Sequence, residues 1–401
     1  MKKHWRIIDD IKEANPEARV VLVGDHVTAL PRESMENSKV DYVLTGGDFD
    51  FLLANLFEYL EGKGKLEPGI WYRENGEIKS TGIFRLNHDL DGLPFIDRDL
   101  TKWWLYSEKN GNFKNTPGTY TMVGRDCWWR KNGGCTFCSW PTLYPSFRVR
   151  KPELLIDEIG ALIENYKVKE VFDDTGTFPV GQWLRKFTRL MIEKKYSEET
   201  KFSCNMRFGS LTREDYRLMR KAGFRMLLFG VESANQQTLD KLNKGITVEG
   251  IIKECRMARE EGLEPHITIM VGYPWETRDD ALATLRLARM LMERGWALTL
   301  QSTVVMPYPR TRLYEEALEK GWFRVDPRDY DRFDMTEPVL KTHDMQPEEV
   351  MRICDEIYKV FLSPRYVLRH LVRIRSWRDA KYSVKGVVKV LGHVKDFAGS
   401  K

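Results

Sequence analysis

The stretch Cys127-Trp-Trp-Arg-Lys-Asn-Gly-Gly-Cys135-Thr-Phe-Cys138 holds half of the 6 cysteines of this chain. It follows a strand-like run at 120–123 and precedes a helix-like run that starts near Pro152. Three thiolates from one glycine-containing loop can hold three corners of a 4Fe-4S cluster, because thiolate is the ligand that such clusters use. The fourth iron then has no protein ligand and is open to a small molecule. We therefore predict a metal site at Cys127, Cys135 and Cys138.

Two other uses of these cysteines compete with the cluster. A structural zinc site would want a fourth Cys or His, yet the loop contains no histidine and the remaining cysteines, Cys204, Cys255 and Cys354, are scattered singly. Disulfides are less favoured, because a chain of this size without a signal peptide is expected in the reducing cytoplasm. Zinc stays open as the alternative metal.

At this loop the chain resembles the radical S-adenosylmethionine (radical SAM) enzymes, whose signature is CxxxCxxC with an aromatic residue often before the last cysteine. Phe137 has that aromatic place, and Cys135-Thr-Phe-Cys138 matches the second half. The first gap here is seven residues instead of three, which changes the path of the loop and leaves the set of ligands intact.

Composition limits the remaining possibilities. A chain of 401 residues with 42% hydrophobic residues can build two or three domains with cores of their own. A net charge of +5 is too small to indicate a nucleic-acid partner. No apolar run approaches the roughly 20 residues that a membrane-spanning helix needs, so we expect no transmembrane segment.

Strand-like and helix-like runs alternate six times between Thr119 and Gly321. The predicted strands are 119–123, 170–174, 201–207, 225–231, 266–271 and 299–305, and helices are predicted at 154–166, 183–194, 212–221, 248–261 and 278–294. Strict alternation implies a parallel sheet, and six units with apolar strands indicate an open, partial (β/α)6 barrel. The predicted fold is therefore α/β, with this barrel at 118–325.

Polar residues and glycines follow these strands, at the end where barrels of this kind place their sites. Carboxylates there can hold an amino group and ribose hydroxyls, arginine can pair with a carboxylate through two hydrogen bonds, and glycine lets the backbone approach a ligand. The predicted cofactor-binding residues at the strand ends are Asp173, Asp174, Asn205, Arg207, Glu232, Ser233 and Gly272. Taken singly, each could instead be a helix cap or half of an ordinary ion pair.

Several blocks of this region resemble the cobalamin-linked branch of the radical SAM enzymes. They are Asp-Asp-x-x-x-Phe at 173–178, Gly-Val-Glu-Ser at 230–233, Leu-Asn-Lys-Gly at 242–245, Gly-Tyr-Pro-x-Glu-Thr at 272–277 and Pro-Tyr-Pro-x-Thr-x-Leu-Tyr at 307–314. The resemblance implies that Glu232 and Arg207 contact the methionine end of S-adenosylmethionine, with Asp174 and Tyr273 nearby. Tyr273 and Tyr308 are the candidate catalytic residues. The glycine usual after Pro-Tyr-Pro is Arg310 here.

Residues 1–66 resemble the second half of a cobalamin-binding domain. Arg19 to Gly24 and Asp41 to Thr45 are predicted strands, and Phe51 to Leu60 is a predicted helix with a period near 3.6. The Asp-x-His-x-x-Gly loop, which supplies a lower axial histidine in that domain, occurs nowhere in the chain. His26 is a candidate replacement, although a hydrogen-bonded turn residue is its more ordinary role. We predict a truncated Rossmann-like domain that binds cobalamin without a ligand below it, or not at all.

The remaining segments are a connector at 67–117, with short strands at 70–72 and 78–80, and a helical, basic C-terminal region at 326–401. Helix-like runs there cover 347–362 and 366–377. Arginines crowd apolar residues between Arg365 and Arg378. Such a run can rest on anionic lipid or on a negatively charged substrate, but it is more often a solvated helix packed on the barrel.

The resemblance implies an enzyme that cleaves S-adenosylmethionine reductively with a 4Fe-4S cluster and functionalises an unactivated carbon, by cobalamin-linked methyl transfer. One alternative is a radical reaction without cobalamin, such as cyclisation, oxidation or carbon-carbon coupling. Another is a metal-bearing binding protein on a retained scaffold. The implied partners are a small-molecule or lipid-like substrate and an electron donor such as ferredoxin or flavodoxin, with no nucleic acid.

Overall fold

The computed structural model describes residues 1–109, 113–144, 146–374, 376–377 and 379–386. The chain divides into two compact units, each made of segments that are separated in the sequence. The barrel unit comprises Leu90–Trp128, Arg148–Val305 and Leu340–Lys401. The front unit comprises Met1–Asp89, Trp129–Phe147 and Met306–Val339.

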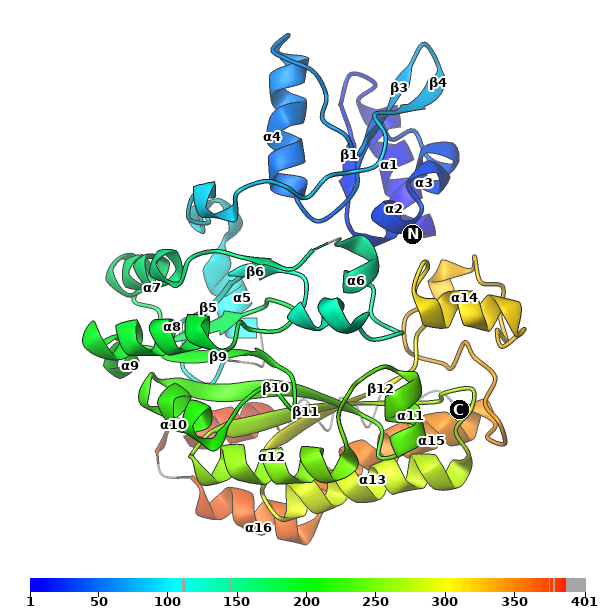
Figure 1. Cartoon of the computed structure of the whole chain (residues 1–401). Coiled ribbons are helices and arrows are strands. Elements are labelled where there is room, and N and C mark those ends of the chain that lie inside the picture. The colour runs from blue at the N-terminus through cyan, green and yellow to red at the C-terminus, as the bar shows by residue number, and fades with distance from the viewer. Residues whose placement is uncertain (110–112, 145, 375, 378, 387–401) are drawn as a thin grey trace. The chain divides into compact units, whose positions relative to one another are not determined.

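A six-stranded sheet forms the centre of the barrel unit (Figure 1). In spatial order its strands are β12 (Thr299–Val304), β11 (Glu264–Val271), β10 (Phe224–Glu232), β9 (Lys201–Met206), β8 (Glu170–Asp173) and β5 (Gly118–Thr121). All neighbours pair in parallel. The sequence prediction of a partial (β/α)6 barrel is confirmed, with strand ends shifted by one to two residues.

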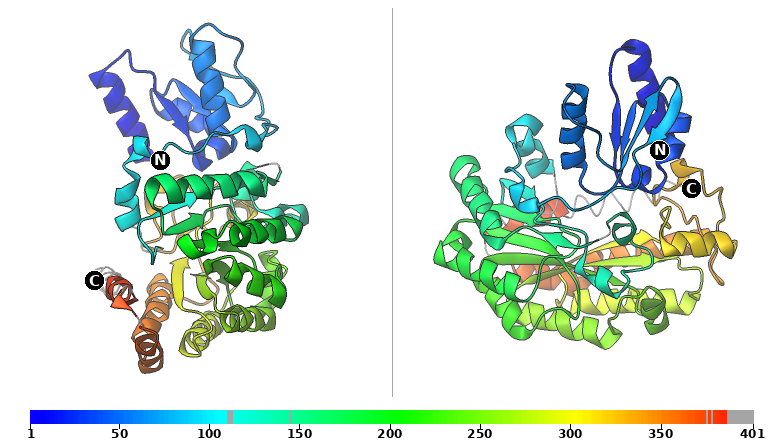
Figure 2. Two further views of the ribbon diagram at one scale, coloured as in Figure 1. Left: turned by 90° about the vertical axis from the view of Figure 1, so that its left-hand side faces the viewer. Right: turned by 45° about the horizontal axis from the view of Figure 1, so that its top comes forward.

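Helices that connect the strands flank this sheet (Figures 1 and 2). They are α7 (Pro152–Tyr166), α8 (Gln182–Glu193), α9 (Tyr196–Glu199), α10 (Arg213–Lys221), α11 (Gln236–Lys241), α12 (Val248–Glu260) and α13 (Arg278–Glu293). Local sequence defines where several of them begin. Thr212 and Thr277 cap α10 and α13 as reciprocal capping boxes, each with an Asp three residues later.

Charged residues at the starts of the strands are paired with one another. Arg225, at the beginning of β10, donates from Nε to Glu170 Oε1 (2.9 Å) and from Nη1 to Glu264 Oε2 (2.6 Å). Glu170 and Glu264 begin β8 and β11. This end of the barrel is therefore closed by buried ion pairs, as expected for the face that contributes stability instead of chemistry.

The front unit contains a four-stranded sheet in the order β1 (Val21–Val23), β2 (Tyr42–Leu44), β3 (Ile70–Glu74) and β4 (Glu77–Ser80). Strands β1 and β2 are parallel, whereas β2, β3 and β4 are antiparallel. The two strands that the sequence assigned to a connector thus complete the front sheet. The helices of this unit are α1 (Lys2–Ala14), α2 (Asp25–Ala29), α3 (Pro31–Asn37), α4 (Phe49–Leu60), α6 (Trp140–Leu143) and α14 (Arg312–Glu319).

The barrel unit also has α5 (Trp103–Lys109), α15 (Pro347–Tyr358), α16 (Pro364–Val372) and a ribbon of two short strands, β6 (Gly124–Arg125) and β7 (Arg148–Val149). Helix α15 packs on β12, and α16 packs on α13. In the part of the chain that the structure describes, no helix is both long enough and apolar enough to span a bilayer.

Candidate active site

The cysteine loop starts and ends at the β6–β7 ribbon. Gly124 pairs with Val149, and Arg125 pairs with Arg148, so the base of the loop is closed by antiparallel backbone bonds. Just after β6 the buried Asp126 adopts a left-handed conformation with φ 76°. Cys127 follows, with its Sγ 3.1 Å from Thr177 Oγ1. The first cysteine is therefore positioned by the barrel unit.

Cys135 and Cys138 lie in the part of the loop that belongs to the front unit. The Cys138 amide donates to the Cys135 carbonyl (3.3 Å), which places both on one turn. Helix α14 holds this turn: Arg312 Nη2 donates to the carbonyls of Gly133 and Gly134 (3.0 and 2.8 Å). Sequence reasoning did not identify Arg312, because a long-range bond to a backbone carbonyl leaves no local pattern.

The two groups of cysteines differ in their surroundings. Cys127, Cys135 and Cys138 are partly exposed, whereas Cys204, Cys255 and Cys354 are buried. Burial raises the pKa of each buried thiol, that of Cys354 to about 12. Since a metal ligand must be a thiolate, the donors of the loop fit an iron-sulfur cluster and the others do not. Among the described residues, which include these three cysteines, the structure shows no group of three or more His, Cys, Asp or Glu side chains placed to hold a metal ion.

Asp173, at the end of β8, supports the strand that leads into the cysteine loop. Its Oδ2 accepts from Thr121 Oγ1 and from the Val123 amide, both at 2.9 Å, and its Oδ1 accepts from the Thr175 amide (3.2 Å). The side chain is fully buried, and burial raises the pKa of Asp173 to about 6. In the structure this carboxylate, predicted to bind a cofactor, is engaged by the protein itself.

Asp174 follows β8, Asn205 is the second-last residue of the neighbouring β9, and Arg207 follows β9. Asn205 Nδ2 donates to Asp174 Oδ1 and to the Thr175 carbonyl, both at 3.1 Å. Asp174 is exposed, and Arg207 is buried with 6% of its surface accessible. The strand ends therefore bring a carboxylate, an amide and a guanidinium to one edge of the sheet.

Glu232 ends β10 in a strained backbone conformation. Its φ is 65°, and the Ser233 amide donates to the Val231 carbonyl (2.9 Å), so Glu232 is the central residue of a γ-turn. The pairing of β10 with β11 shifts register between Gly230 and Glu232. Non-glycine residues with positive φ cost free energy and are concentrated at functional sites, which makes Glu232 the most informative residue at this edge.

The carboxylate of Glu232 is held by Lys244 and lies over Gly230. Lys244 Nζ is 3.0 Å from Glu232 Oε1, and the two side chains are only 7% and 8% exposed. A Cβ at position 230 would overlap Glu232 Oε1, so a side chain there would have to displace this carboxylate. Sequence reasoning missed Lys244, although it had singled out the Leu-Asn-Lys-Gly block that contains it.

Ser233 faces away from this group. Its Oγ donates to Glu276 Oε1 (2.5 Å) and accepts from the Asn235 amide (3.0 Å). Burial raises the pKa of Glu276 to about 7. The helix caps in this region are Asn235 for α11 and Gly181 for α8, so neither Glu232 nor the Asp173–Asp174 pair serves as a cap.

Gly272 and Tyr273 follow β11. Gly272 has φ 99°, and a Cβ there would meet Val350 Cγ1 at 3.0 Å, so a side chain is excluded on both grounds. Tyr273 is fully buried and stacks on Trp275, with ring centroids 5.4 Å apart. Gly272 is itself buried against Val350, and Tyr273 contributes packing.

Tyr308 and His26 belong to the front unit. Tyr308 is 38% exposed, and two residues later Arg310 has φ 68°, the conformation that glycine favours. His26 lies in α2 instead of at a strand end, and its Nε2 is 2.9 Å from Glu33 Oε2. Tyr330 also donates to Glu33 (2.9 Å). With Nε2 bonded to Glu33, a metal could bind His26 only through Nδ1, the other ring nitrogen.

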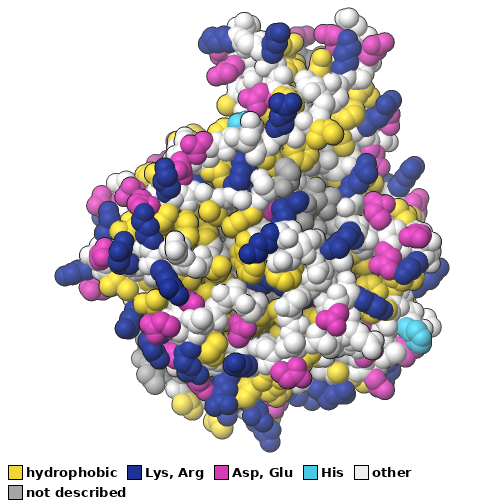
Figure 3. Space-filling model, in the orientation of Figure 1, with side chains coloured by type: hydrophobic (Ala, Val, Ile, Leu, Met, Phe, Trp, Pro, Cys, Tyr) yellow, Lys and Arg dark blue, Asp and Glu magenta, His cyan; other side chains and the backbone are white. Residues whose placement is uncertain are grey.

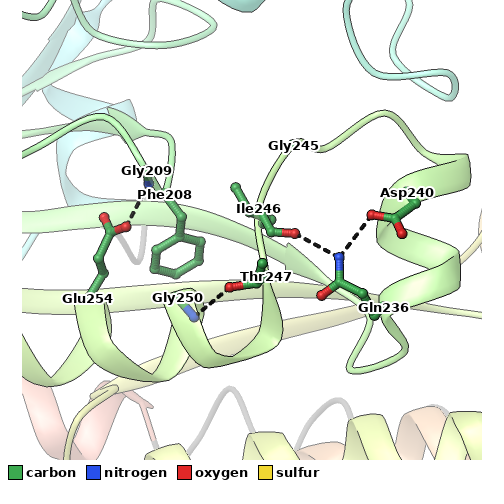
Figure 4. A pocket seen from close by; sticks show the side chains of 9 residues that line it. All are labelled: Phe208, Gly209, Gln236, Asp240, Gly245, Ile246, Thr247, Gly250 and Glu254. Atoms are coloured by element: carbon green, nitrogen blue, oxygen red, sulfur yellow. Dashed lines mark hydrogen bonds between the residues drawn. The ribbon is translucent and has the colours of Figure 1, made fainter.

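A cavity of about 360 Å³ lies between the loop after β9 and helices α11 and α12. Figure 4 shows the Phe208 ring between Glu254 and Gln236. Glu254 accepts from the Gly209 amide (2.7 Å), and Gln236 donates to Asp240 (2.9 Å). Each of these polar groups already bonds to a neighbouring residue, and we assign the cavity no part in the site.

Residues 123–288 match the family described as the Radical SAM superfamily. An uncharacterized methyltransferase of Pyrococcus horikoshii is 26% identical over 94% of this chain and 80% of its own length. The anaerobic magnesium-protoporphyrin IX monomethyl ester cyclase of Cereibacter sphaeroides is 26% identical over 82% of this chain, which spans 52% of that protein. Among solved structures, the radical S-adenosylmethionine methyltransferase TsrM from Kitasatospora setae, with cobalamin and a [4Fe-4S] cluster bound, superposes with a TM-score of 0.64 and 17% identity, covering 90% of this chain and 69% of that one.

Proposed function

Because the chain belongs to the radical SAM superfamily, we propose that this enzyme cleaves S-adenosylmethionine reductively and methylates an unactivated carbon with the help of cobalamin. The observation that carries the proposal is the edge of the sheet where β8 to β11 end. Asp174, Asn205, Arg207 and Glu232 lie at the ends of three neighbouring parallel strands there, and Gly272 follows the fourth. Ligand sites of parallel α/β folds lie at this edge.

The proposed roles follow from the chemistry of each side chain. Arg207 can pair with the carboxylate of the methionine moiety through two parallel hydrogen bonds. Glu232 accepts from the amino group, while Lys244 offsets the charge of its carboxylate and fixes its position. Asp174 and Asn205 are suited to bind ribose hydroxyls, since they present a carboxylate acceptor and an amide side by side at this edge of the sheet. Of the two candidate catalytic tyrosines, Tyr308 is partly exposed and stays a candidate for contact with the substrate, whereas Tyr273 is fully buried.

The loop cysteines Cys127, Cys135 and Cys138 would hold the 4Fe-4S cluster, which supplies the electron for cleavage. The protein's part is to bind S-adenosylmethionine in one orientation and to exclude water from it. An electron donor such as ferredoxin or flavodoxin and a cytoplasmic setting belong to this proposal, because the cluster needs a reductant and free thiols.

The methyl-transfer assignment draws on the names of two relatives. The Pyrococcus protein is called a methyltransferase, and TsrM is a methyltransferase with cobalamin bound. A reaction without cobalamin is the second candidate. The name of the cyclase relative supports a radical reaction other than methyl transfer, such as cyclisation.

The test is mass spectrometry of the nucleosides formed by anaerobically reconstituted protein with S-adenosylmethionine, a strong reductant and cobalamin. We expect 5'-deoxyadenosine, with S-adenosylhomocysteine only when cobalamin is present. Cys138→Ala should abolish both products. Cys255→Ala is the matched control, because it removes a thiol that is buried in α12. Failure of the unmodified protein to bind iron and sulfide would overturn the proposal, and 5'-deoxyadenosine alone would favour the second candidate.

A further inference from the structure

Helix α16 packs on the barrel unit with a polar face. Tyr366 is buried, and its hydroxyl donates to the Leu298 carbonyl (3.0 Å). Arg373 Nη2, seven residues on, donates to the Gly295 carbonyl (3.3 Å). Between them, the half-buried His370 stacks on Tyr366. The inward face of α16 therefore consists of side chains that make hydrogen bonds.

The outward face of α16 is apolar. Leu368 is 65% exposed, Leu371 57% and Val372 74%, and their spacing of three and four residues places them on one side of the helix. This reverses the usual arrangement, in which a surface helix turns its apolar stripe to the core. Single exposed leucines are ordinary, but a contiguous patch of them indicates an interaction site.

Trp377, 85% exposed, and Leu362, 50% exposed, extend this apolar surface along the chain. Hydrophobic and basic side chains occur together at the lower edge of the molecule in Figure 3, where Figure 1 labels α16. We call the exposed residues Leu362, Leu368, Leu371, Val372 and Trp377 the α16 patch.

The charge around the α16 patch is mainly positive. Residues 363–378 include five arginines and no acidic residue. Arg365 is 82% exposed at its side chain, and the acidic group that faces it is Glu293 on α13, at 3.6 Å. Arg369 is also exposed. The patch is thus an apolar surface flanked by positive charge.

We propose that the α16 patch rests on the surface of an anionic lipid bilayer. Helices that lie in a membrane interface combine an apolar face with Lys and Arg, and they bind by apolar burial together with attraction to anionic headgroups. Tryptophan is favoured at the level of the headgroups, because it joins an apolar ring to a polar N–H. A second copy of this chain fits less well, since a two-fold contact would place arginines against arginines.

The test is co-sedimentation of the full-length, anaerobically reconstituted protein with vesicles of phosphatidylcholine, with and without phosphatidylglycerol. We expect binding to the anionic vesicles that weakens as salt is added. Arg365→Glu with Arg369→Glu should lower the binding constant by about tenfold or more. Leu371→Ser with Val372→Ser should lower it as well, through the loss of apolar area.

Leu100→Ser is the matched control, because Leu100 is 82% exposed and lies far from α16 in the sequence; this variant should bind as the unmodified protein does. Equal binding to neutral and anionic vesicles, or none to either, would overturn the proposal. A different outcome would assign the patch to a second copy of the chain. In that case the unmodified protein would form dimers without binding vesicles, and the Leu371→Ser, Val372→Ser variant would not form these dimers. Binding is measured without S-adenosylmethionine, so the outcome does not depend on the proposed reaction.

Discussion

Replacing Lys244 with methionine tests the buried pair that positions Glu232. The ammonium and carboxylate groups are 3.0 Å apart, and both side chains are more than nine-tenths buried. Methionine keeps the length of the side chain and removes the charge, so the Glu232 carboxylate is left buried without its cation. Breaking such a pair from one side costs about 3–5 kcal/mol of folding free energy. For a unit of this size, a loss of about 3 kcal/mol lowers the melting temperature by roughly 6–12 °C.

A double-mutant cycle separates the pair from the lysine alone. In Lys244→Met with Glu232→Gln both charges of the pair are removed, and more than half of the lost melting temperature should return. The double variant should still fail to produce 5'-deoxyadenosine, because the carboxylate proposed to hold the amino group is absent. The assay is thermal unfolding followed by tryptophan fluorescence at pH 7.5.

Lys253→Met is the control for this cycle, because Lys253 is exposed on the neighbouring helix α12. It should change the melting temperature by less than 2 °C. If Lys244→Met is equally mild, or if the double variant is less stable than Lys244→Met, then the pair does not fix Glu232 and the reasoning is wrong.

Three further predictions concern single positions. Gly230→Ala should displace the Glu232 carboxylate, which a Cβ would overlap, and should lower the free energy of unfolding by about 1–3 kcal/mol. Equilibrium dialysis should show weaker binding of S-adenosylmethionine to this variant. Unchanged affinity would contradict the role assigned to Glu232. Arg310→Gly should be about 1 kcal/mol more stable than Arg310→Ala in urea unfolding, because residue 310 has φ 68° and both variants lose the same bond to the Ala29 carbonyl. For Glu276, the folded-state pKa of about 7 exceeds the ordinary 4.5, so its contribution to stability is complete below pH 4.5 and is lost as the pH rises through 7. Between pH 4.5 and 7, this carboxyl group should lower the free energy of unfolding by about 3 kcal/mol, and Glu276→Gln should remove that decline. If the free energies of unfolding of the two proteins change with pH in parallel, the reasoning is refuted.

The barrel could be predicted from the sequence because its signals are local. Its strands are buried apolar runs, and its helices have a period near 3.6 with Thr-x-x-Asp caps at Thr212 and Thr277. The rule that sites follow the strand ends proposed Asp174, Asn205, Arg207 and Glu232, whose role in a site stays a prediction. The same rule also proposed Asp173 and Ser233, because it does not specify side-chain direction. The structure shows Asp173 bonded to Thr121 and Ser233 bonded to Glu276.

What the sequence did not reveal depends on contacts between distant residues. Lys244 reaches Glu232 across 12 positions, and Arg312 reaches the cysteine loop across 179. The β6–β7 ribbon has strands of two residues, which are too short for any periodicity. The orientation of α16 was also beyond prediction, since its sequence is amphipathic but does not state which face is covered.

The division of the front unit into three separated segments bears on the order in which the protein matures. Between Asp89 and Val339 the ribosome adds 250 residues, since 339 − 89 = 250, which takes about 10–50 s at ordinary rates of translation. During that interval the N-terminal segment has been made but lacks α14, and the turn that carries Cys135 and Cys138 lacks the Arg312 bonds that hold it. The nascent chain therefore reaches an ordered cysteine turn only after the strands of the barrel have all been synthesised. Loading of iron and sulfide is expected to be a late, post-translational event, and a chain truncated before residue 312 should accumulate without metal.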